Sequence, residues 1–435
     1  MAQIEEKSDK VYPEERYGLL PSEWGNGGSD GDRGRRSRTR ALDDQEQGKN
    51  AKTGGSLGIY AKYKHTGLKT DPETGEIIQF DPMAAMVERY ILQSVARRLL
   101  PTSITAKCMR VKRTKALVEV WQSTEHKKAF YIGLVTCGSV WRCPVCSAKI
   151  AARRRQELID AMDAHKAAGG CVNMLTLTCP HQWGDDLVDL LAKQAKALNN
   201  FWKDRQVKAI LAEMGTIGQV RALEATHGRL SPQNNGWHPH YHILLFQGVN
   251  VDLGRFNDAQ IRDWQVRLYL RWANACKLAG LGEPSFEHGL KLDDGSRAEK
   301  YITKWGLEDE MTKGHTKKAL HGETPFDFLR AYLADKNDKQ AAALFIEFAN
   351  IFKGKRQLHW SKGLKKRFGI GEKTDDQIAE EKVDRSHFLS RLTDDQWRDV
   401  LAVEGRASVL SIATSSGWDG VLAFLESIKG KGVKK

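Results

Sequence analysis

The stretch HPHYHILLF, residues 238–246, decides how the chain is interpreted, because it joins three alternating histidines to an apolar run. Successive side chains of a strand point to opposite faces of a sheet, so His238, His240 and His242 would share one face. Imidazoles two residues apart on a rigid strand can bind one metal ion. The apolar run that follows is typical of a strand entering a core. The stretch therefore predicts a core strand with a metal site; the alternative is a surface strand that is merely rich in histidine.

The segments around this strand predict the element order β-α-β-β-α-β followed by a helix. Ser-Pro and Asn-Asn-Gly in the loop before the histidines are turn signals, so we expect the two strands that flank this loop to pair antiparallel. The order is that of a split βαβ unit, which predicts an α+β fold with a ferredoxin-like or RRM-like antiparallel sheet and flanking helices. The expected strands are 172–178, 219–227, 238–246 and 285–292, and the expected helices are 185–205, 259–279 and 297–305.

An acidic residue, Glu224, lies in the strand expected to pair with the histidine strand. Residues 222, 224 and 226 would share one face, so Glu224 and His227 cannot both point toward the metal. One carboxylate with two imidazoles suits Mg²⁺ or Mn²⁺ and leaves open positions for phosphate oxygens. The alternative is that Glu224 is a plain cross-strand charge partner.

Four of the seven cysteines, Cys108, Cys137, Cys143 and Cys146, follow one another in a pattern that fits a small tetrahedral zinc site. Thiolates bind zinc strongly enough to fold such a zinc-ribbon-like knuckle without much core. His126 is the alternative to Cys108 as fourth ligand. Ordinary buried cysteines are a further alternative. A redox Cys-x-x-Cys is disfavoured, because no thioredoxin-like βαβ pattern surrounds it.

Composition points to a polyanionic partner inside the cell. The 435 residues carry a formal charge of +13, which favours nucleic acid or an anionic surface. No uninterrupted apolar run approaches the length of a membrane span, and the polar, acidic N-terminus lacks the apolar core of a signal peptide. The odd cysteine count argues against a disulfide scaffold. We therefore expect a cytoplasmic protein that binds nucleic acid and no membrane.

A further motif, Tyr301-x-x-Lys304, falls in the last expected helix. Residues three apart share a helix face, so the phenol and the ammonium group would lie together. A tyrosine beside a cation and a metal-bound phosphate can act as a nucleophile. The alternative is a tyrosine packed in the core.

These motifs together resemble the HUH endonuclease superfamily, and within it the plasmid rolling-circle replication initiator (Rep) proteins. The resemblance rests on Leu175-Thr-Leu-Thr178, the histidine strand and Tyr301-x-x-Lys304. CGSVWRCPVCSAKIAARR at 137–154 and GKRQLHWSKGLKKRFG at 354–369 resemble flanking signatures of the same family. The similarity covers about residues 105–370, and the two ends are outside it.

The resemblance implies a metal-dependent, site-specific nickase and strand transferase. His240 and His242 would be the metal pair, with His238 either a third ligand or a DNA contact. Tyr301 would attack the scissile phosphate, leaving a 5′-phosphotyrosine and a free 3′-OH primer, and the enzyme would rejoin ends at termination. Lys304 would stabilise the phosphate or help to activate the phenol. Implied partners are origin DNA in single-stranded and hairpin form, host helicase and DNA polymerase, with a dimer at the origin left open.

Termination in related initiators often uses a glutamate just before the tyrosine to activate water. Here Arg297 stands one helical turn before Tyr301, and Glu299 would lie nearly on the opposite helix face. Glu308 is four residues after Lys304 and is the geometric alternative. Glu299 and Glu308 both stay open as the water-activating residue.

DNA specificity is expected outside the catalytic centre, on basic segments with aromatic residues between the cations. Such surfaces grip phosphates and stack on bases; the alternative is a basic face that is merely solvated. The candidate DNA-binding residues are Arg153, Arg154, Arg155, Lys355, Arg356, Lys365, Lys366 and Arg367.

The chain is long enough for two or three domains, and its composition divides it into four parts. Residues 1–80 are expected to be a largely disordered basic and polar tail. Residues 81–168 would hold a helix and the four-cysteine zinc region, and 169–370 the endonuclease domain with basic trailing helices. Residues 371–435 would form a small helical C-terminal region.

Three other functions compete with the replication initiator. An HUH single-strand transposase would share the chemistry, but paired tyrosines in the nucleophile helix would favour it, and only Tyr301 occurs there. A conjugative relaxase usually has its tyrosine before the histidine motif, the reverse of this order. A non-catalytic, zinc-dependent DNA-binding regulator would tolerate Tyr301→Phe.

Overall fold

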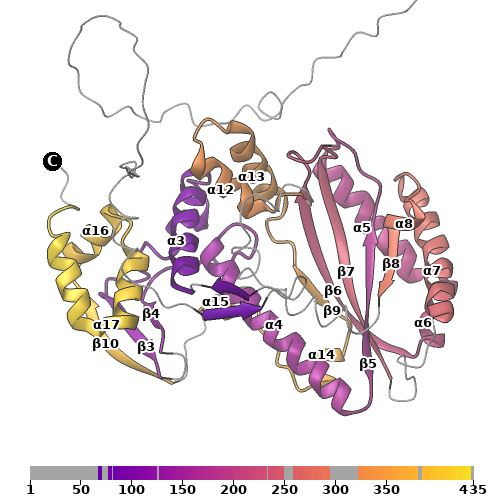
Figure 1. Ribbon diagram of the computed structural model, residues 1–435, viewed down its shortest axis with the longest axis horizontal. Helices are drawn as coiled ribbons and strands as arrows, with labels where there is room; N and C mark the ends of the chain where they lie inside the picture. Colours follow the sequence, from indigo (N-terminus) through magenta and orange to yellow (C-terminus); the bar gives the residue numbers. More distant parts are fainter. Residues whose placement is uncertain are drawn as a thin grey trace, which may run out of the picture.

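The computed structural model of the chain contains two sheets with helices packed around them (Figure 1). A third, two-stranded ribbon consists of β1 (Gly67–Thr70) and β2 (Ile77–Phe80), within the part expected to be a disordered tail. The residues that the structure describes are 67–70, 77–80, 82–124, 127–232, 234–248, 258–293, 322–380 and 385–432.

The larger sheet has five antiparallel strands in the order β8-β5-β7-β6-β9. The first four have the spatial order of a split βαβ unit, because the third strand along the chain lies between the first and the second. The expected α+β fold with an antiparallel core and flanking helices is therefore confirmed. The strands are β5 (Cys171–Thr178), β6 (Thr216–His227), β7 (Trp237–Gln247), β8 (Leu290–Asp293) and β9 (Leu358–Trp360).

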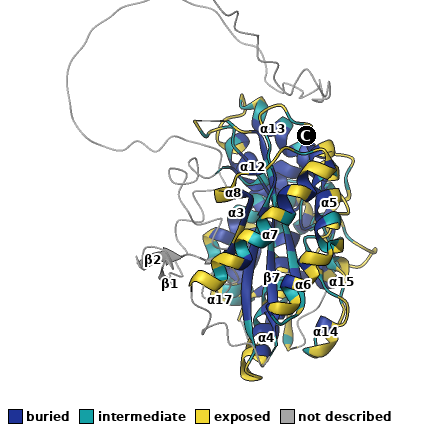
Figure 2. Cartoon of the chain, turned by 90° about the vertical axis from the view of Figure 1, so that its right-hand side faces the viewer, coloured by how far each residue is buried: buried dark blue, intermediate teal, exposed yellow. Residues whose placement is uncertain are grey.

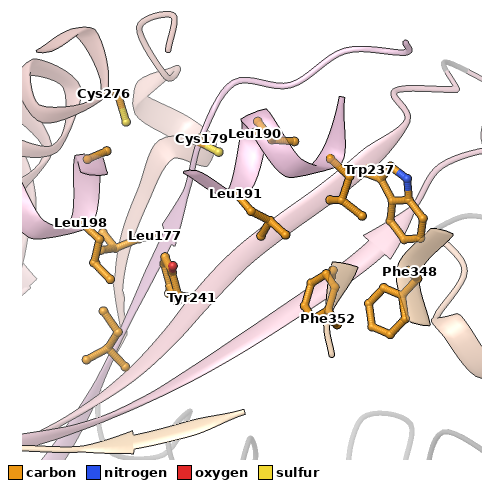
Figure 3. Packing of buried hydrophobic residues seen from close by; sticks show 14 of the residues in the cluster. Leu177, Cys179, Leu190, Leu191, Leu198, Trp237, Tyr241, Cys276, Phe348 and Phe352 are labelled. Atoms are coloured by element: carbon orange, nitrogen blue, oxygen red, sulfur yellow. The ribbon is translucent and has the colours of Figure 1, made fainter. Parts of the chain in front are cut away.

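One face of this sheet forms the main core. Alternation along β7 directs Tyr241, Ile243 and Leu245 to this face, and all three are buried. They pack with the apolar sides of α5 (Leu187–Lys203), α6 (Arg205–Glu213) and α7 (Asp258–Ala279). Figure 3 shows Leu191 and Leu198 of α5 near Tyr241. Truncation of a residue such as Ile243 to alanine would cost about 2–5 kcal/mol.

The opposite face of the sheet is covered at one end by α4 (Pro144–Ala167). There Leu244 and Phe246 of β7 pack with Leu158 and Met162 of the helix. The histidines lie at the other end of the same face, beyond this apolar cluster. Figure 2 shows the strand buried in the middle of the molecule, whereas the outward sides of α6 and α7 are exposed.

The smaller sheet has the order β10-β3-β4 and combines two distant parts of the chain. β10 (Ser386–Leu392) pairs antiparallel with β3 (Val118–Ser123), which also pairs with β4 (Ala129–Ile132). Its inner face packs with α3 (Pro82–Leu99), α16 (Asp394–Ala402) and α17 (Arg406–Ser427). The C-terminal segment thus contributes a strand to a sheet with residues 118–132, and is not purely helical. How the chain divides into domains stays a prediction.

The expected strand 285–292 is wrong over its first half. Residues Phe286–Gly289 form the short helix α8, and β8 begins only at Leu290. The reason is local, because the Ser285 side chain accepts a hydrogen bond from the backbone N–H of His288 and so caps a helical turn. The expected helix 297–305 lies outside the described residues.

The remaining elements lie between these strands and helices along the chain. The 3-10 helix η1 (Ile104–Lys107) precedes the first zinc-site cysteine. The trailing segments form α12 (Pro325–Ala334), α13 (Lys339–Ile351), α14 (Leu364–Arg367) and α15 (Asp375–Glu380). By length and composition, α17 is the one helix in the described part of the chain that could cross a membrane, and 50% of its most apolar window is buried. Core helices pass the same test.

Candidate functional site

Three polar side chains meet on the uncovered end of the large sheet. The register pairs Glu224 of β6 with His240 of β7, and Ala222 with His242. The Nε2 atoms of His240 and His242 lie 3.5 Å and 3.7 Å from Oε2 of Glu224. One ligand atom from each residue lies within 4.8 Å of the others. The side chains are 29%, 12% and 18% exposed for Glu224, His240 and His242, so the group is open on one side.

Neighbouring groups orient the two imidazoles. On β5, Thr176 is paired with His242, and its Oγ1 lies 3.1 Å from Nδ1 of that ring. Nδ1 of His240 lies 3.3 Å from the carbonyl oxygen of His238. Both rings therefore present Nε2 toward Glu224. Outer contacts of this kind hold metal-binding imidazoles in one tautomer and orientation.

The charge of Glu224 dominates the electrostatics of the group. Burial lowers the pKa of His240, but the hydrogen bond and negative charge of Glu224 outweigh burial and raise it above its ordinary value. A divalent cation could replace that proton between the carboxylate and the imidazole. The mixed donor set, its separations and its open side fit a metal such as Mg²⁺ or Mn²⁺.

His238 lies on the same face but is not part of this group. Its ring is stacked between His181, with centroids 4.6 Å apart, and His240, with centroids 4.9 Å apart. Burial lowers the pKa of His238 to about 3, helped by the neighbouring His240, His181 and His242. A neutral, stacked ring supports its neighbour, and a role as third ligand or DNA contact stays a prediction.

The remaining predicted catalytic residues lie outside the described residues. This holds for Tyr301, Lys304, Glu299 and Glu308, all within 294–321. The described chain resumes at residue 322. The next residue, Glu323, forms an isolated antiparallel β-bridge with His227 at the end of β6. The chain therefore returns to the same sheet after this segment.

The four predicted cysteine ligands form a separate, buried group. Cys108 follows η1, Cys143 caps α4, and Cys146 lies in the first turn of that helix. Sγ of Cys146 lies 3.4 Å from that of Cys108 and 3.7 Å from that of Cys137, and Sγ of Cys143 lies 3.7 Å from that of Cys108. Tetrahedral zinc with bonds of about 2.3 Å would place sulfurs about 3.8 Å apart. The group therefore fits a metal such as zinc.

The thiols of this group have mainly one another as polar neighbours. Hydrogen bonds with Cys108, Cys143 and Cys146 lower the pKa of Cys137 below its ordinary value. Gln93 of α3 donates from Nε2 to Sγ of Cys143 over 3.2 Å. His126, the alternative fourth ligand, lies outside the described residues.

The predicted DNA-binding residues divide into two largely buried cations and six that are exposed or half-exposed. Arg154 donates to Glu157 and Asp375, and its side chain is 12% exposed. Lys365 is 5% exposed and lies 3.2 Å from Glu157. These two cations stabilise the contact of α4 with the segment after β9 and are not available to phosphates in this structure. Exposed or half-exposed members are Arg153, Arg155, Lys355, Arg356, Lys366 and Arg367.

Sequence reasoning missed three supporting residues. Thr176 had a usable signal, since Leu-Thr-Leu-Thr alternates opposite the histidine strand. His181 lies three residues after β5, and no sequence pattern around it indicated a contact with the histidine strand. Gln93 lies on an apolar helix far from any cysteine in sequence, and only the packing of α3 on α4 brings it to Cys143.

Comparison with known proteins agrees with this arrangement over part of the chain. Residues 134–264 match the family described as "Replication protein". This chain is 25% identical over 301 residues to "Protein rep" of Streptomyces lividans, covering 55% of this chain and 65% of that protein. It is 30% identical over 166 residues to the "Neomycin resistance protein" of Streptomyces cyanogenus, covering 33% of this chain and 37% of that protein.

The matches therefore span less than two thirds of these relatives. No solved structure matches the chain. The family match includes three of the four zinc-site cysteines and both strands of the Glu224 group. Together these similarities support a replication protein.

Proposed function

We propose that this protein is a plasmid rolling-circle replication initiator that nicks one strand of its origin. The observation that carries the proposal is the group of Glu224, His240 and His242 on the open end of an antiparallel sheet face. The similarity to replication proteins supports the same conclusion. An HUH single-strand transposase has no comparable support from the relatives.

The geometry of the group suits phosphate chemistry. A Mg²⁺ or Mn²⁺ ion bound there would polarise the scissile phosphate and neutralise part of its charge. Glu224 and the two imidazoles would occupy one side, and the exposed side would admit the DNA strand. Thr176 would hold the ring of His242 in place throughout the reaction.

Tyr301 would supply the nucleophile. Its phenolic oxygen would form a bond to phosphorus while the bond from phosphorus to the 3′-oxygen breaks. The phenol loses its proton, the 3′-oxygen gains one, and the DNA is left with a 5′-phosphotyrosine and a 3′-OH primer. Lys304 would stabilise the charge that develops on the phosphate. At termination, Glu299 or Glu308 would activate the water or hydroxyl that releases the tyrosine.

The rest of the molecule would serve the DNA. The cysteine group would stiffen the start of α4. The exposed Arg153 on that helix would contact phosphates, and so would four cations of a later segment: Lys355, Arg356, Lys366 and Arg367. We expect a cytoplasmic protein with origin DNA, a host helicase and DNA polymerase as partners, and a dimer at the origin as an open arrangement. The net charge of +13 supports a nucleic-acid partner.

A cleavage assay tests the proposal. Purified protein is mixed with single-stranded oligonucleotides that tile the origin of its plasmid, with Mn²⁺ or with EDTA. We expect a metal-dependent cut and a covalent protein–DNA adduct that mass spectrometry maps to Tyr301. Tyr301→Phe should lose the cut and keep origin binding, whereas the control Tyr332→Phe, in a buried residue of α12, should cut normally. Tight origin binding without any cut or adduct would instead favour the zinc-dependent regulator.

A further inference from the structure

The outer face of the small sheet carries a row of aromatic side chains. The register pairs Trp121 of β3 with Phe130 of β4 on one side and with Phe388 of β10 on the other. Paired residues of neighbouring strands point to the same face, so the three rings lie side by side across the sheet. Val118 and Val120, which alternate with Trp121, point to the opposite face and are buried against α17 and its neighbours.

The described residues leave this aromatic row open. Phe388 is 44% exposed, and Trp121 and Phe130 are half-buried. Aromatic rings on a water-facing sheet lose hydrophobic stabilisation, so neighbouring exposed rings mark an interaction site. The row lies in the sheet drawn at the left of Figure 1, whereas the Glu224 group lies in the sheet at the right.

The rings are held in place by polar contacts along one edge of the row. Nε1 of Trp121 donates to Glu119 over 2.9 Å, and Nε of Arg391 donates to the same carboxylate over 3.1 Å. The guanidinium of Arg391 lies 5.4 Å from the ring centre of Phe388, and the Trp121 and Phe388 rings are 5.5 Å apart. The indole N–H is therefore already satisfied, and its faces are left for apolar or stacking contacts.

Cations flank this row on both sides along the strand direction. Lys127 and Lys128 are exposed at the start of β4, and Arg385 precedes β10, where its carbonyl accepts from Thr124. Arg391 lies on the other side of the row, and the acidic residue paired with it, Glu119, is neutralised by that pairing. Aromatic rings flanked by cations complement a nucleic acid, whose bases offer flat faces for stacking and whose phosphates are negatively charged.

We propose that this face is a stacking platform for single-stranded DNA, with bases on the rings of Trp121, Phe130 and Phe388 and phosphates near Lys128 and Arg391. Single strands expose base faces that a duplex keeps stacked, so the platform would prefer them. The inference deepens the proposed function, because nicking and unwinding an origin produces such strands. The platform and the nicking group lie on different sheets and can fail independently.

The decisive variant is Phe388→Ala, compared with Phe286→Ala as a matched control. Phe286 is also an exposed aromatic, 37% exposed, and forms an edge-to-face pair with Tyr269 at 5.0 Å. Binding of a fluorescent oligo-dT of about 15 nucleotides, within the range of known single-strand site sizes, is measured by anisotropy without added divalent metal. We expect Phe388→Ala to weaken binding roughly 5- to 150-fold and Phe286→Ala to leave it within about twofold. Equal effects of the two variants, or no effect of Phe388→Ala, would overturn the proposal.

Two further measurements separate stacking from loss of fold and from general charge. Phe388→Leu keeps an apolar side chain but no aromatic face, so it should bind oligo-dT as weakly as Phe388→Ala while its unfolding curve stays close to wild type. Full oligo-dT binding by Phe388→Leu would mean that an apolar side chain suffices at this position, and would overturn the stacking platform. Lys128→Gln should reduce the slope of log affinity against log salt by about 0.7, whereas Lys208→Gln, an exposed lysine on α6, should not.

The proposed nicking activity is assayed on the same variants. Metal-dependent cleavage of a short origin oligonucleotide should be unchanged in Phe388→Ala at saturating DNA. Wild-type protein that binds oligo-dT through Phe388 but never cleaves would overturn the nicking proposal and leave the platform standing. Cleavage with no contribution of Phe388 to oligo-dT binding would overturn the platform and leave the nicking proposal standing.

Discussion

The two groups of side chains that could hold a metal ion differ in how they are enclosed. The cysteine group is buried, with Cys108 and Cys143 0% exposed, and its four sulfurs lie within 4.8 Å of one another. The Glu224 group offers three donors of mixed chemistry and is open toward solvent. Closed tetrahedral sites leave a metal no position for substrate, whereas open sites keep one. From this difference we expect the first group to serve stability and the second to serve the proposed chemistry.

The largest effect expected from this contrast is that of Cys143→Ser. Losing one thiolate of a closed site removes most of the metal-binding free energy, and here that energy also holds α3, η1 and α4 together. We expect less than one zinc per chain by metal analysis and a loss of at least about 4 kcal/mol of unfolding free energy. Cys276→Ala, which alters a buried cysteine outside the group, is the control and should keep its zinc. Full zinc content in Cys143→Ser would contradict the assignment.

His242→Ala should show the opposite pattern. The partly exposed imidazole contributes little to packing, so the unfolding free energy should change by less than about 1 kcal/mol. Metal-dependent cleavage should fall by roughly 10³-fold, because several kcal/mol of charge stabilisation are lost. Zinc content should not change. A variant that unfolds like Cys143→Ser, or that still cuts at the wild-type rate, would break the comparison.

Thr176→Val sharpens the comparison at the open group. The substitution keeps the shape of the side chain and removes the hydroxyl 3.1 Å from Nδ1 of His242. Losing such a contact typically weakens metal binding about 10- to 100-fold, which Mn²⁺ titration of the cleavage rate would measure. Thr178→Val is the matched control, because that hydroxyl donates to the carbonyl of His288 rather than to a ring. Equal Mn²⁺ requirements in the two variants would argue against an orienting role for Thr176.

The smallest effect concerns Gln93, the residue beside the closed group. Gln93→Glu keeps an oxygen for Arg406, which donates to Oε1 of Gln93 over 2.5 Å, but replaces the N–H donor to Cys143 by a carboxylate. The negative charge next to a thiolate should speed the release of zinc to a chromogenic chelator about 10-fold. Gln156→Glu, on the exposed side of α4, should release zinc at the wild-type rate. An unchanged rate in both would mean that the contact with Cys143 does not influence the metal.

Sequence alone predicted the sheet and the geometry of its open group because both follow from period-two alternation. The spacing of His240 and His242 defines a face, and the turn-rich loop before them sets the pairing that brings Glu224 opposite His240. Cys108 could be assigned only as one of two alternatives, since nothing in the spacing fixes a ligand about 30 residues from its partners. In the structure Cys108 lies with the other three cysteines, whereas His126 lies outside the described residues, so the fourth ligand stays a prediction.

Two of the elements that the sequence did not predict correctly have local reasons. The SHFLSRL segment of β10 has a bulge between Phe388 and Ser390, which breaks the alternation that would have indicated a strand. Ser285 starts a helical turn where apolar alternation suggested a strand, because its side chain caps the backbone. The aromatic row could not be seen in sequence at all, since Trp121 and Phe388 meet only through pairing of segments far apart in the chain.

The pairing of β3 with β10 affects how the protein folds during its synthesis on the ribosome. The strands of the large sheet fall within residues 171–360, all synthesised before β10 emerges. β10 must pair with β3, which was synthesised far earlier in the chain. Pairing two such distant segments is slow compared with forming local contacts, so the small sheet should be completed last. A chain that stops before residue 386 would keep the metal-binding histidines and lack one third of the aromatic row. If both proposals hold, such a fragment would have the residues for cleavage but an incomplete platform for single-stranded DNA. Binding of single-stranded DNA by the platform would then begin only when the chain is nearly complete.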